Sequence, residues 1–185
     1  MKTFLTLLLV GLALPVFSAI TNSELSVSIA VPYAPNRLAA FGRRSDTNDT
    51  RVLCRSWEKN FHVVLRNISD KPQNIWQGDN SWGYYALSFE LTDESGKSWV
   101  AKKILTVFYQ NGPMFWTLRP NEALVIDVCF TDDQESDWQK WNGFPHNQTV
   151  SMRAIFEVKE DRFSEKYSVW TGRVVSESNK FFFAD

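Results

Sequence analysis

The chain has 185 residues, of which 20 are basic and 21 acidic, so its net charge is −1. This balance argues against nucleic acid as a partner, because nucleic-acid binding favours a basic face, and it gives no electrostatic reason to sit on an anionic membrane. A chain of this length can bury roughly 70% of its unfolded surface and is expected to form one domain.

Residues 1–19 have the pattern of a secretory signal peptide. Lys2 supplies a positive charge, residues 4–16 form a Leu-rich apolar run, and Ser18 and Ala19 are small residues suited to cleavage. The apolar run is shorter than the ~20 residues of a membrane-spanning helix. We therefore expect an exported, soluble protein, secreted or periplasmic, without a membrane span, whose single domain comprises residues 20–185.

Apolar and polar residues alternate with a period of two through much of the chain after residue 24. The alternating segments lie at residues 25–31, 61–66, 84–91, 98–103, 124–130, 150–158 and 169–176. Turns rich in Asn, Asp, Gly and Pro separate them, as at residues 67–72 and 93–96. Such a series is typical of an antiparallel all-β sandwich or barrel.

The two cysteines, Cys54 and Cys129, are predicted to form a disulfide, because a lone pair in an exported protein meets an oxidising compartment. The bond would close a loop of about 75 residues, which in the chain-entropy treatment stabilises the fold by on the order of 4 kcal/mol. Cys129 shares a strand face with Val125 and Asp127, so the bond is expected outside the core. The alternative is two separate buried thiols.

Motifs of catalysis and metal binding are missing from the sequence. His62 and His146 are the only histidines, and no Gly-x-Ser-x-Gly elbow, phosphate loop or dinucleotide fingerprint occurs. The acidic run at residues 132–137 lacks the glycine and final glutamate of a calcium loop. We therefore expect no enzyme, no cofactor and no metal site. A hydrolase with a pair of carboxylates is a lesser alternative, because any two acids could face each other.

An aromatic, turn-rich run at residues 76–85 is the first candidate site. Flat aromatic faces beside amide and carboxylate groups can stack on sugar rings and bind their hydroxyls, so the run could be a carbohydrate platform. The same residues could instead plug a packed corner at the end of the fold. The platform residues would be Trp76, Asp79, Asn80, Trp82, Tyr84 and Tyr85.

Two long irregular segments, residues 32–57 and 131–149, are the second place to look, because such loops are often functional. The first contains five arginines, and Arg43 and Arg44 could meet an acidic partner or pair with the acidic run of the second. Long polar-aromatic loops on a rigid scaffold suit recognition. The leading hypothesis is therefore a non-enzymatic binding domain for a protein partner, and the alternative is a carbohydrate-binding module.

Three Asn-x-Ser/Thr sequons begin at Asn48, Asn67 and Asn147, all in expected loops or turns. Each would accept a glycan only in a host that glycosylates exported proteins. At Asn67, which opens the turn ending in Pro72, the asparagine is better suited to forming the turn than to carrying a sugar.

The order of strands and turns resembles a known group of domains. Residues 61–72 and 84–97 have the order strand, Asn-x-Ser-Asp-Lys-Pro turn, strand, Asp-x-x-Gly-Lys turn, and Arg119-Pro-Asn-Glu122 precedes the next strand. This order resembles the immunoglobulin-like domains of exported bacterial proteins, including those similar to the BsuPI proteinase inhibitors. It implies a single immunoglobulin-like antiparallel β-sandwich of seven to nine strands and transfers no functional residue.

Overall fold

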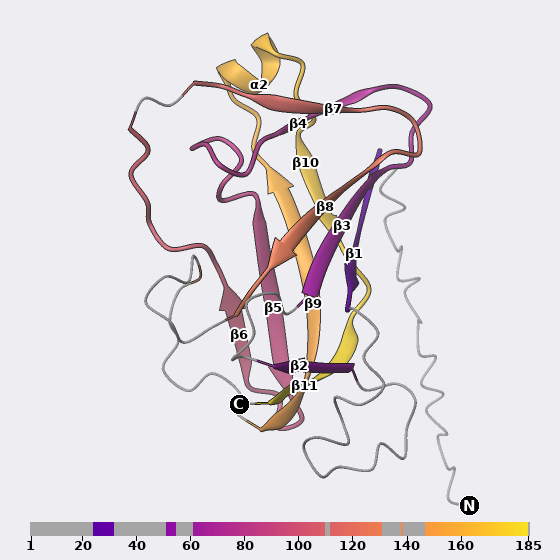
Figure 1. Cartoon of the computed structure of the whole chain (residues 1–185), viewed down its shortest axis with the longest axis vertical. Helices are drawn as coiled ribbons and strands as arrows, with labels where there is room; N and C mark the ends of the chain where they lie inside the picture. Colours follow the sequence, from indigo (N-terminus) through magenta and orange to yellow (C-terminus); the bar gives the residue numbers. More distant parts are fainter. Residues whose placement is uncertain are drawn as a thin grey trace, which may run out of the picture.

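The computed structural model describes residues 24–31, 51–54, 61–109, 112–130, 138 and 147–184 (Figure 1). These residues form eleven strands and the short helix α2 (Arg162–Lys166), so the described part of the chain is all-β, as the alternation predicts. The predicted signal peptide, Arg43 and Arg44, Asn48, His146 and the acidic run at residues 132–137 lie outside the described residues.

The smaller of the two principal sheets has three antiparallel strands. Its order is β1 (Leu25–Ala30), β3 (Phe61–Asn67) and β8 (Ala123–Val128). Along β1 and β3, buried residues alternate with more exposed ones, and Val27 lies opposite Leu65 in the register. One face of this sheet therefore contributes to the core and the other faces outward, because successive side chains of a strand point to opposite faces.

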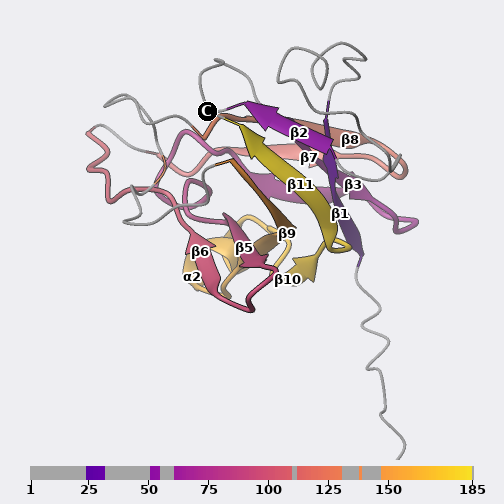
Figure 2. The ribbon, with the colours of Figure 1, turned by 90° about the horizontal axis from the view of Figure 1, so that it is seen from below.

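The larger sheet has six strands. They are β2 (Arg51–Cys54), β11 (Asn179–Ala184), β9 (Gln148–Val158), β5 (Leu87–Asp93) and β6 (Ser98–Ala101) in that order, with β10 (Gly172–Val175) also paired to β9. The pairing of β2 with β11 is parallel, which departs from the predicted all-antiparallel arrangement. Both strands lie at the end of the molecule seen from below in Figure 2.

A third, two-stranded sheet pairs β4 (Gln73–Trp76) with β7 (Phe115–Leu118). The described part of the chain thus has more strands than the seven to nine predicted. The strands outside the predicted segments are β11, whose run Phe181, Phe182 and Phe183 does not alternate, and β2, β4 and β7, which have four residues each. A four-residue strand shows only two residues on each face, which is too few to be recognised by alternation.

Aromatic side chains from both principal sheets meet in one continuous core. The rings of Phe61, Phe89 and Phe130 are in mutual edge contact, with centroids 5.2 to 5.4 Å apart. Trp138 packs against Phe89 and Phe130 at 5.2 and 5.3 Å. Because Phe61 comes from β3 and Phe89 from β5, this cluster joins the two sheets across their inner faces.

The predicted disulfide between Cys54 and Cys129 is not formed in the structure. Cys54 ends β2 of the larger sheet, whereas Cys129 follows β8 of the smaller one. Cys129 is half-buried between the core residues Val128 and Phe130, so alternation directs its side chain to the outer face of its sheet. The prediction was wrong because the redox compartment favours oxidation of neighbouring thiols but does not bring two strands together.

Asn67, in the second sequon, is fully buried and shapes the turn after β3. Its amide nitrogen donates to the carbonyls of Lys71 (2.7 Å) and Leu118 (2.9 Å). Its carbonyl oxygen accepts from the amide (2.9 Å) and hydroxyl (2.8 Å) of Ser69. A glycan on Asn67 would break these bonds, so in the folded domain this sequon is a turn and not an attachment site. Asn147, in the third sequon, is exposed.

Candidate functional site

Residues 76–85, here called the aromatic corner, connect β4 to β5. Asn80 is fully buried at its centre and organises the turn. Its side-chain oxygen accepts from the amides of Trp82 (3.0 Å) and Gly83 (3.1 Å), while its side-chain nitrogen donates to the Met114 carbonyl (3.1 Å). Because these protein groups use both ends of the Asn80 amide, the side chain shapes the turn and does not face a ligand.

The two tryptophans of the aromatic corner pack inward. Trp76 is 3% exposed and contacts Trp82 (5.9 Å between ring centroids), Phe115 (6.4 Å) and Tyr167 (6.1 Å). Trp82, which is half-buried, packs on Phe163 of α2 at 5.1 Å. The rings therefore close the space between the β4–β7 pair and α2, as the corner hypothesis expects of them.

The two tyrosines of the aromatic corner hold another part of the chain. Tyr84 is buried, and Tyr85 is 43% exposed. The Tyr85 hydroxyl accepts a hydrogen bond from the Thr106 amide (2.9 Å) and donates one to the Thr106 carbonyl (3.3 Å). The Thr106 hydroxyl donates to the Tyr84 hydroxyl (3.3 Å). Two of the predicted platform residues thus bind another segment of the protein itself. Asp79 lies exposed in the turn.

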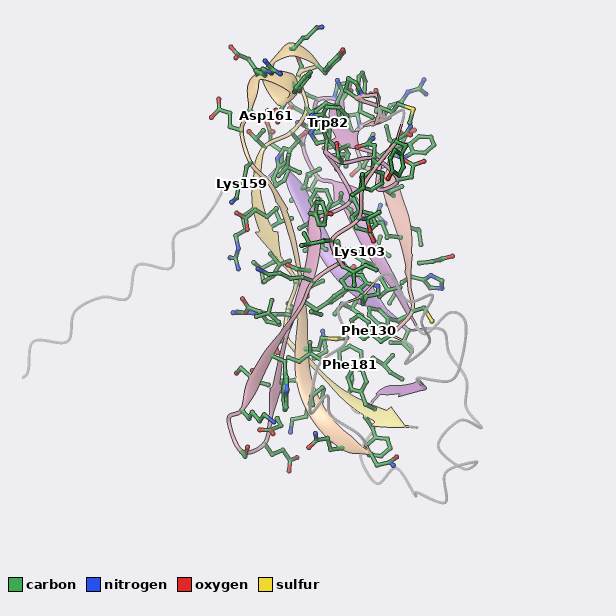
Figure 3. All side chains as sticks on the ribbon, turned by 90° about the vertical axis from the view of Figure 1, so that its left-hand side faces the viewer. Trp82, Lys103, Phe130, Lys159, Asp161 and Phe181 are labelled. Atoms are coloured by element: carbon green, nitrogen blue, oxygen red, sulfur yellow. The ribbon has the colours of Figure 1, made fainter. Side chains whose placement is uncertain are left out.

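A cleft of about 750 Å³, here called the side cleft, opens where β6 ends. The strand β6 pairs with β5 only as far as Ala101, after which the chain leaves the sheet. The cleft lies between this departing chain, the aromatic corner, the end of β9 and α2. Of the predicted platform residues, Trp76, Trp82 and Tyr85 line it. Figure 3 faces this side of the molecule, with Trp82, Lys103, Lys159 and Asp161 in its upper half.

Three lysines and two acids line the side cleft, and each acid already contacts another group of the protein. Asp161 caps α2 by accepting from the amides of Phe163 (2.9 Å) and Ser164 (2.7 Å). Glu157 lies 3.7 Å from the guanidinium of Arg173.

Of the three lysines, the Lys103 ammonium lies over the rings of Tyr84 (4.9 Å) and Trp138 (5.0 Å). Lys102 and Lys159 form no ion pair with any acid in the described part of the chain. The side cleft therefore presents two ammonium groups without an ion-pair partner beside aromatic surface, in a lining of three lysines and two acids.

An exposed apolar segment, which the sequence pattern did not predict, borders the side cleft. Leu105, Val107 and Tyr109 are 90%, 72% and 87% exposed, and we call these three side chains the apolar strip. Between them, Thr106 binds Tyr85, and Phe108 packs on Tyr84 at 5.2 Å. The signal in the sequence was the run at residues 104–109, which is rich in strand-forming residues and directly follows a predicted strand.

The outer face of the three-stranded sheet carries the described histidine. The Nδ1 atom of His62 lies 2.7 Å from a carboxylate oxygen of Asp127, its partner across the β3–β8 register. Among the residues that the structure describes, no three His, Cys, Asp or Glu side chains gather closely enough to hold a metal ion. No helix within the described ranges has the length and apolar character needed to cross a membrane.

Comparisons with protein-family models, with curated proteins and with solved structures give no match for this chain.

Proposed function

We propose that this protein is a non-enzymatic binding domain that recognises a protein partner through the apolar strip. The observation that carries the proposal is the exposure of Leu105, Val107 and Tyr109, between 72% and 90%, on one side of an anchored segment. Contiguous exposed apolar side chains are a common mark of interaction sites, because leaving them in water is unfavourable. The loop with Arg43 and Arg44 lies outside the described residues, so the proposal does not use it.

The anchoring of the segment also supports a role in recognition. Thr106 is bound through its amide, carbonyl and hydroxyl groups, and Phe108 packs on the domain. The segment is therefore held at Thr106 and Phe108 before any partner arrives. Preorganisation of this kind improves affinity, because less conformational entropy remains to be lost on binding.

We further propose an immunoglobulin-like fold and an exported location for the protein. An immunoglobulin-like sandwich is supported by two sheets, mainly antiparallel, that share one core of buried residues. Export to the periplasm or the medium is supported by the signal-peptide pattern of residues 1–19.

A carbohydrate-binding module is the second candidate, because Trp82 and Tyr85 both line the side cleft. Burial of Trp76 and Tyr84 leaves a smaller stacking surface than the sequence suggested. A hydrolase has less support. Glu157 and Asp161 are the two acids that line the side cleft, and both are engaged by protein groups. Tryptophan fluorescence titrated with soluble polysaccharides tests the carbohydrate candidate, which requires a saturable shift.

Selection from a random-peptide display library tests the leading proposal, because it does not require the partner to be identified first. The immobilised full chain is compared with the double variant Leu105→Asp/Val107→Asp, which places two charges on the apolar strip. The control is Val125→Asp, because Val125 is also exposed (56%) but lies on β8 of the other sheet. We expect a family of related peptides that binds the wild type and Val125→Asp and is lost with the double variant.

Two results would contradict the proposal. One is the absence of any enriched family after selection on the wild type. The other is a family that binds all three proteins with equal affinity, because its site would then lie elsewhere. Circular dichroism of each variant checks that the charged substitutions leave the fold intact.

A further inference from the structure

We infer that the partner lies as an extended strand along residues 104–108 and places an acidic side chain in the side cleft, between Lys102 and Lys159. This inference rests on the proposed function and adds the binding mode and the chemistry of the partner. The direction of the backbone groups at residues 105–107 and the charge of the side cleft support it independently.

The backbone of the segment has groups available for a partner strand. The amide and carbonyl of Thr106 both point to the Tyr85 hydroxyl and hence toward the domain. Leu105, Val107 and Tyr109 are exposed while Phe108 packs on Tyr84, which is the alternation of an extended chain. Backbone groups of adjacent residues point in opposite directions in such a chain, so we expect those of Leu105 and Val107 to point away from Tyr85. Neither residue forms a backbone hydrogen bond with another described residue. An unpaired extended segment of this kind is a template for strand addition.

The charge of the side cleft selects the chemistry of the partner. Glu157 and Asp161 are held by Arg173 and by the first turn of α2, whereas Lys102 and Lys159 have no described acidic partner. An incoming carboxylate would therefore meet two ammonium groups in a recess partly walled by aromatic side chains. Opposite charges placed in this way favour the correct register and speed association.

The position of Leu105 links the two observations. Its side chain lines the side cleft and is also the first member of the apolar strip. A strand paired beside residues 104–108 directs every second side chain to the same face. We therefore expect the bound peptides to carry an acidic residue two positions from an apolar residue.

The experiment measures the affinity of the selected peptide for the wild type, for Lys102→Gln/Lys159→Gln and for the control Lys71→Gln/Lys180→Gln. Both double variants remove two exposed positive charges, but Lys71 and Lys180 lie outside the side cleft. Two ion pairs at a surface site correspond to a loss of about 5- to 10-fold in affinity. We expect this loss only with the cleft variant, and we expect a peptide with its acid replaced by the amide to lose the same factor on the wild type.

Strand addition is tested separately by N-methylating the peptide backbone one position at a time. Methylation at alternate positions should abolish binding, because only every second amide faces residues 104–108. A selected family without an acid, equal affinities for the two lysine variants, or uniform tolerance of N-methyl groups would overturn the inference and leave the proposed function standing. Sedimentation that shows a dimer dissolved by Leu105→Asp/Val107→Asp would assign the apolar strip to a second copy of the chain and overturn both.

Discussion

The Tyr85 hydroxyl is bonded to both backbone groups of Thr106, 21 residues further along the chain. It accepts from the amide at 2.9 Å and donates to the carbonyl at 3.3 Å. The Tyr85 hydroxyl thereby makes the two hydrogen bonds that a neighbouring strand would otherwise make with Thr106. The Thr106 hydroxyl and the Phe108 ring both contact Tyr84, so these side chains face the domain and the alternate side chains of the apolar strip are left exposed.

Tyr85→Phe should release this segment with little effect on the rest of the fold. A net hydrogen bond is worth about 1 kcal/mol, and we expect a loss of stability of that order. Amide exchange at Thr106, whose amide loses its acceptor, should accelerate, while exchange in β3 and β9 should not. The matched control is Tyr109→Phe, because it removes a hydroxyl from a side chain that is 87% exposed. Equal exchange rates of the Thr106 amide in the two variants would contradict the anchoring role.

The absence of the Cys54–Cys129 bond predicts that reducing agent leaves the melting temperature unchanged. A disulfide closing so long a loop would add on the order of 4 kcal/mol, which would shift the melting temperature of a domain of this size by several degrees. Thermal denaturation with and without reductant measures the difference. Alkylation followed by mass analysis should show two modified cysteines in the unfolded, unreduced protein. A protein that takes up no label before reduction would contradict the structure.

The strand faces could be predicted where the alternation is long. Leu25, Val27 and Ile29 of β1 are all buried, as are Met152 and Ala154 of β9, because a continuous period of two leaves only one face for the core. Alternation also places Cys129 on the outer side of its strand. It cannot tell which strands become neighbours, and the disulfide prediction therefore had no geometric basis.

The candidate site was harder to predict because its residues act on distant parts of the chain. Tyr84 and Tyr85 were recognised as unusual, but their partner Thr106 is defined by the packing of the chain that leaves β6. Likewise, Lys159 and Lys102 belong to different strand ends and meet in one cleft only after folding. Composition identified the aromatic corner, whereas the apolar strip became visible only when exposure was known.

Asn67→Ala should be strongly destabilising, because the Asn67 side chain bonds the turn after β3 and the end of β7 together. The substitution leaves the carbonyls of Lys71 and Leu118 without this donor. An unsatisfied buried polar group costs about 1–3 kcal/mol, so we expect a total loss of at least about 2 kcal/mol in chemical denaturation. Asn67→Asp should cost still more, because it directs a buried carboxylate toward both carbonyls. A loss below about 0.5 kcal/mol for either variant, the range of neutral surface changes, would contradict this role.

Asp93 should contribute to stability in a pH-dependent way. The Ser95 hydroxyl, which donates to the Asp93 carboxylate at 2.6 Å, is the chief cause that lowers the pKa of Asp93 below its ordinary value of 3.8. The amides of Ser95 and Lys97 also donate to it, both at 2.9 Å. A carboxyl whose pKa is lower in the folded state stabilises the fold above its unfolded pKa, and this contribution is lost as the pH falls through the folded value.

Asp93→Asn keeps an oxygen for these donors but removes the charge. We therefore expect a lower melting temperature than the wild type at pH 7, with the difference shrinking at pH values well below 3.8. Asp79→Asn is the control, because the Asp79 side chain is exposed and forms no hydrogen bond within the described part of the chain. A difference between Asp93→Asn and wild type that stays constant with pH would contradict the assignment.

Gly83 and Gly78 offer a matched pair of substitutions within the aromatic corner. A Cβ atom on Gly83 would overlap the carbonyl oxygen of Gln77 and lie 2.9 Å from the Trp76 Cβ, whereas a Cβ on Gly78 meets nothing within 4 Å. The obstacle at Gly83 includes backbone, so the corner must shift, and overpacking of this kind costs about 1–3 kcal/mol. Gly78→Ala should stay within about 0.5 kcal/mol of the wild type.

Because Gly83 also donates its amide to Asn80, displacing it should disturb the turn that places Tyr85. We therefore expect Gly83→Ala, but not Gly78→Ala, to lower thermal stability and to speed amide exchange at Thr106. Equal behaviour of the two variants would show that the corner does not position the segment.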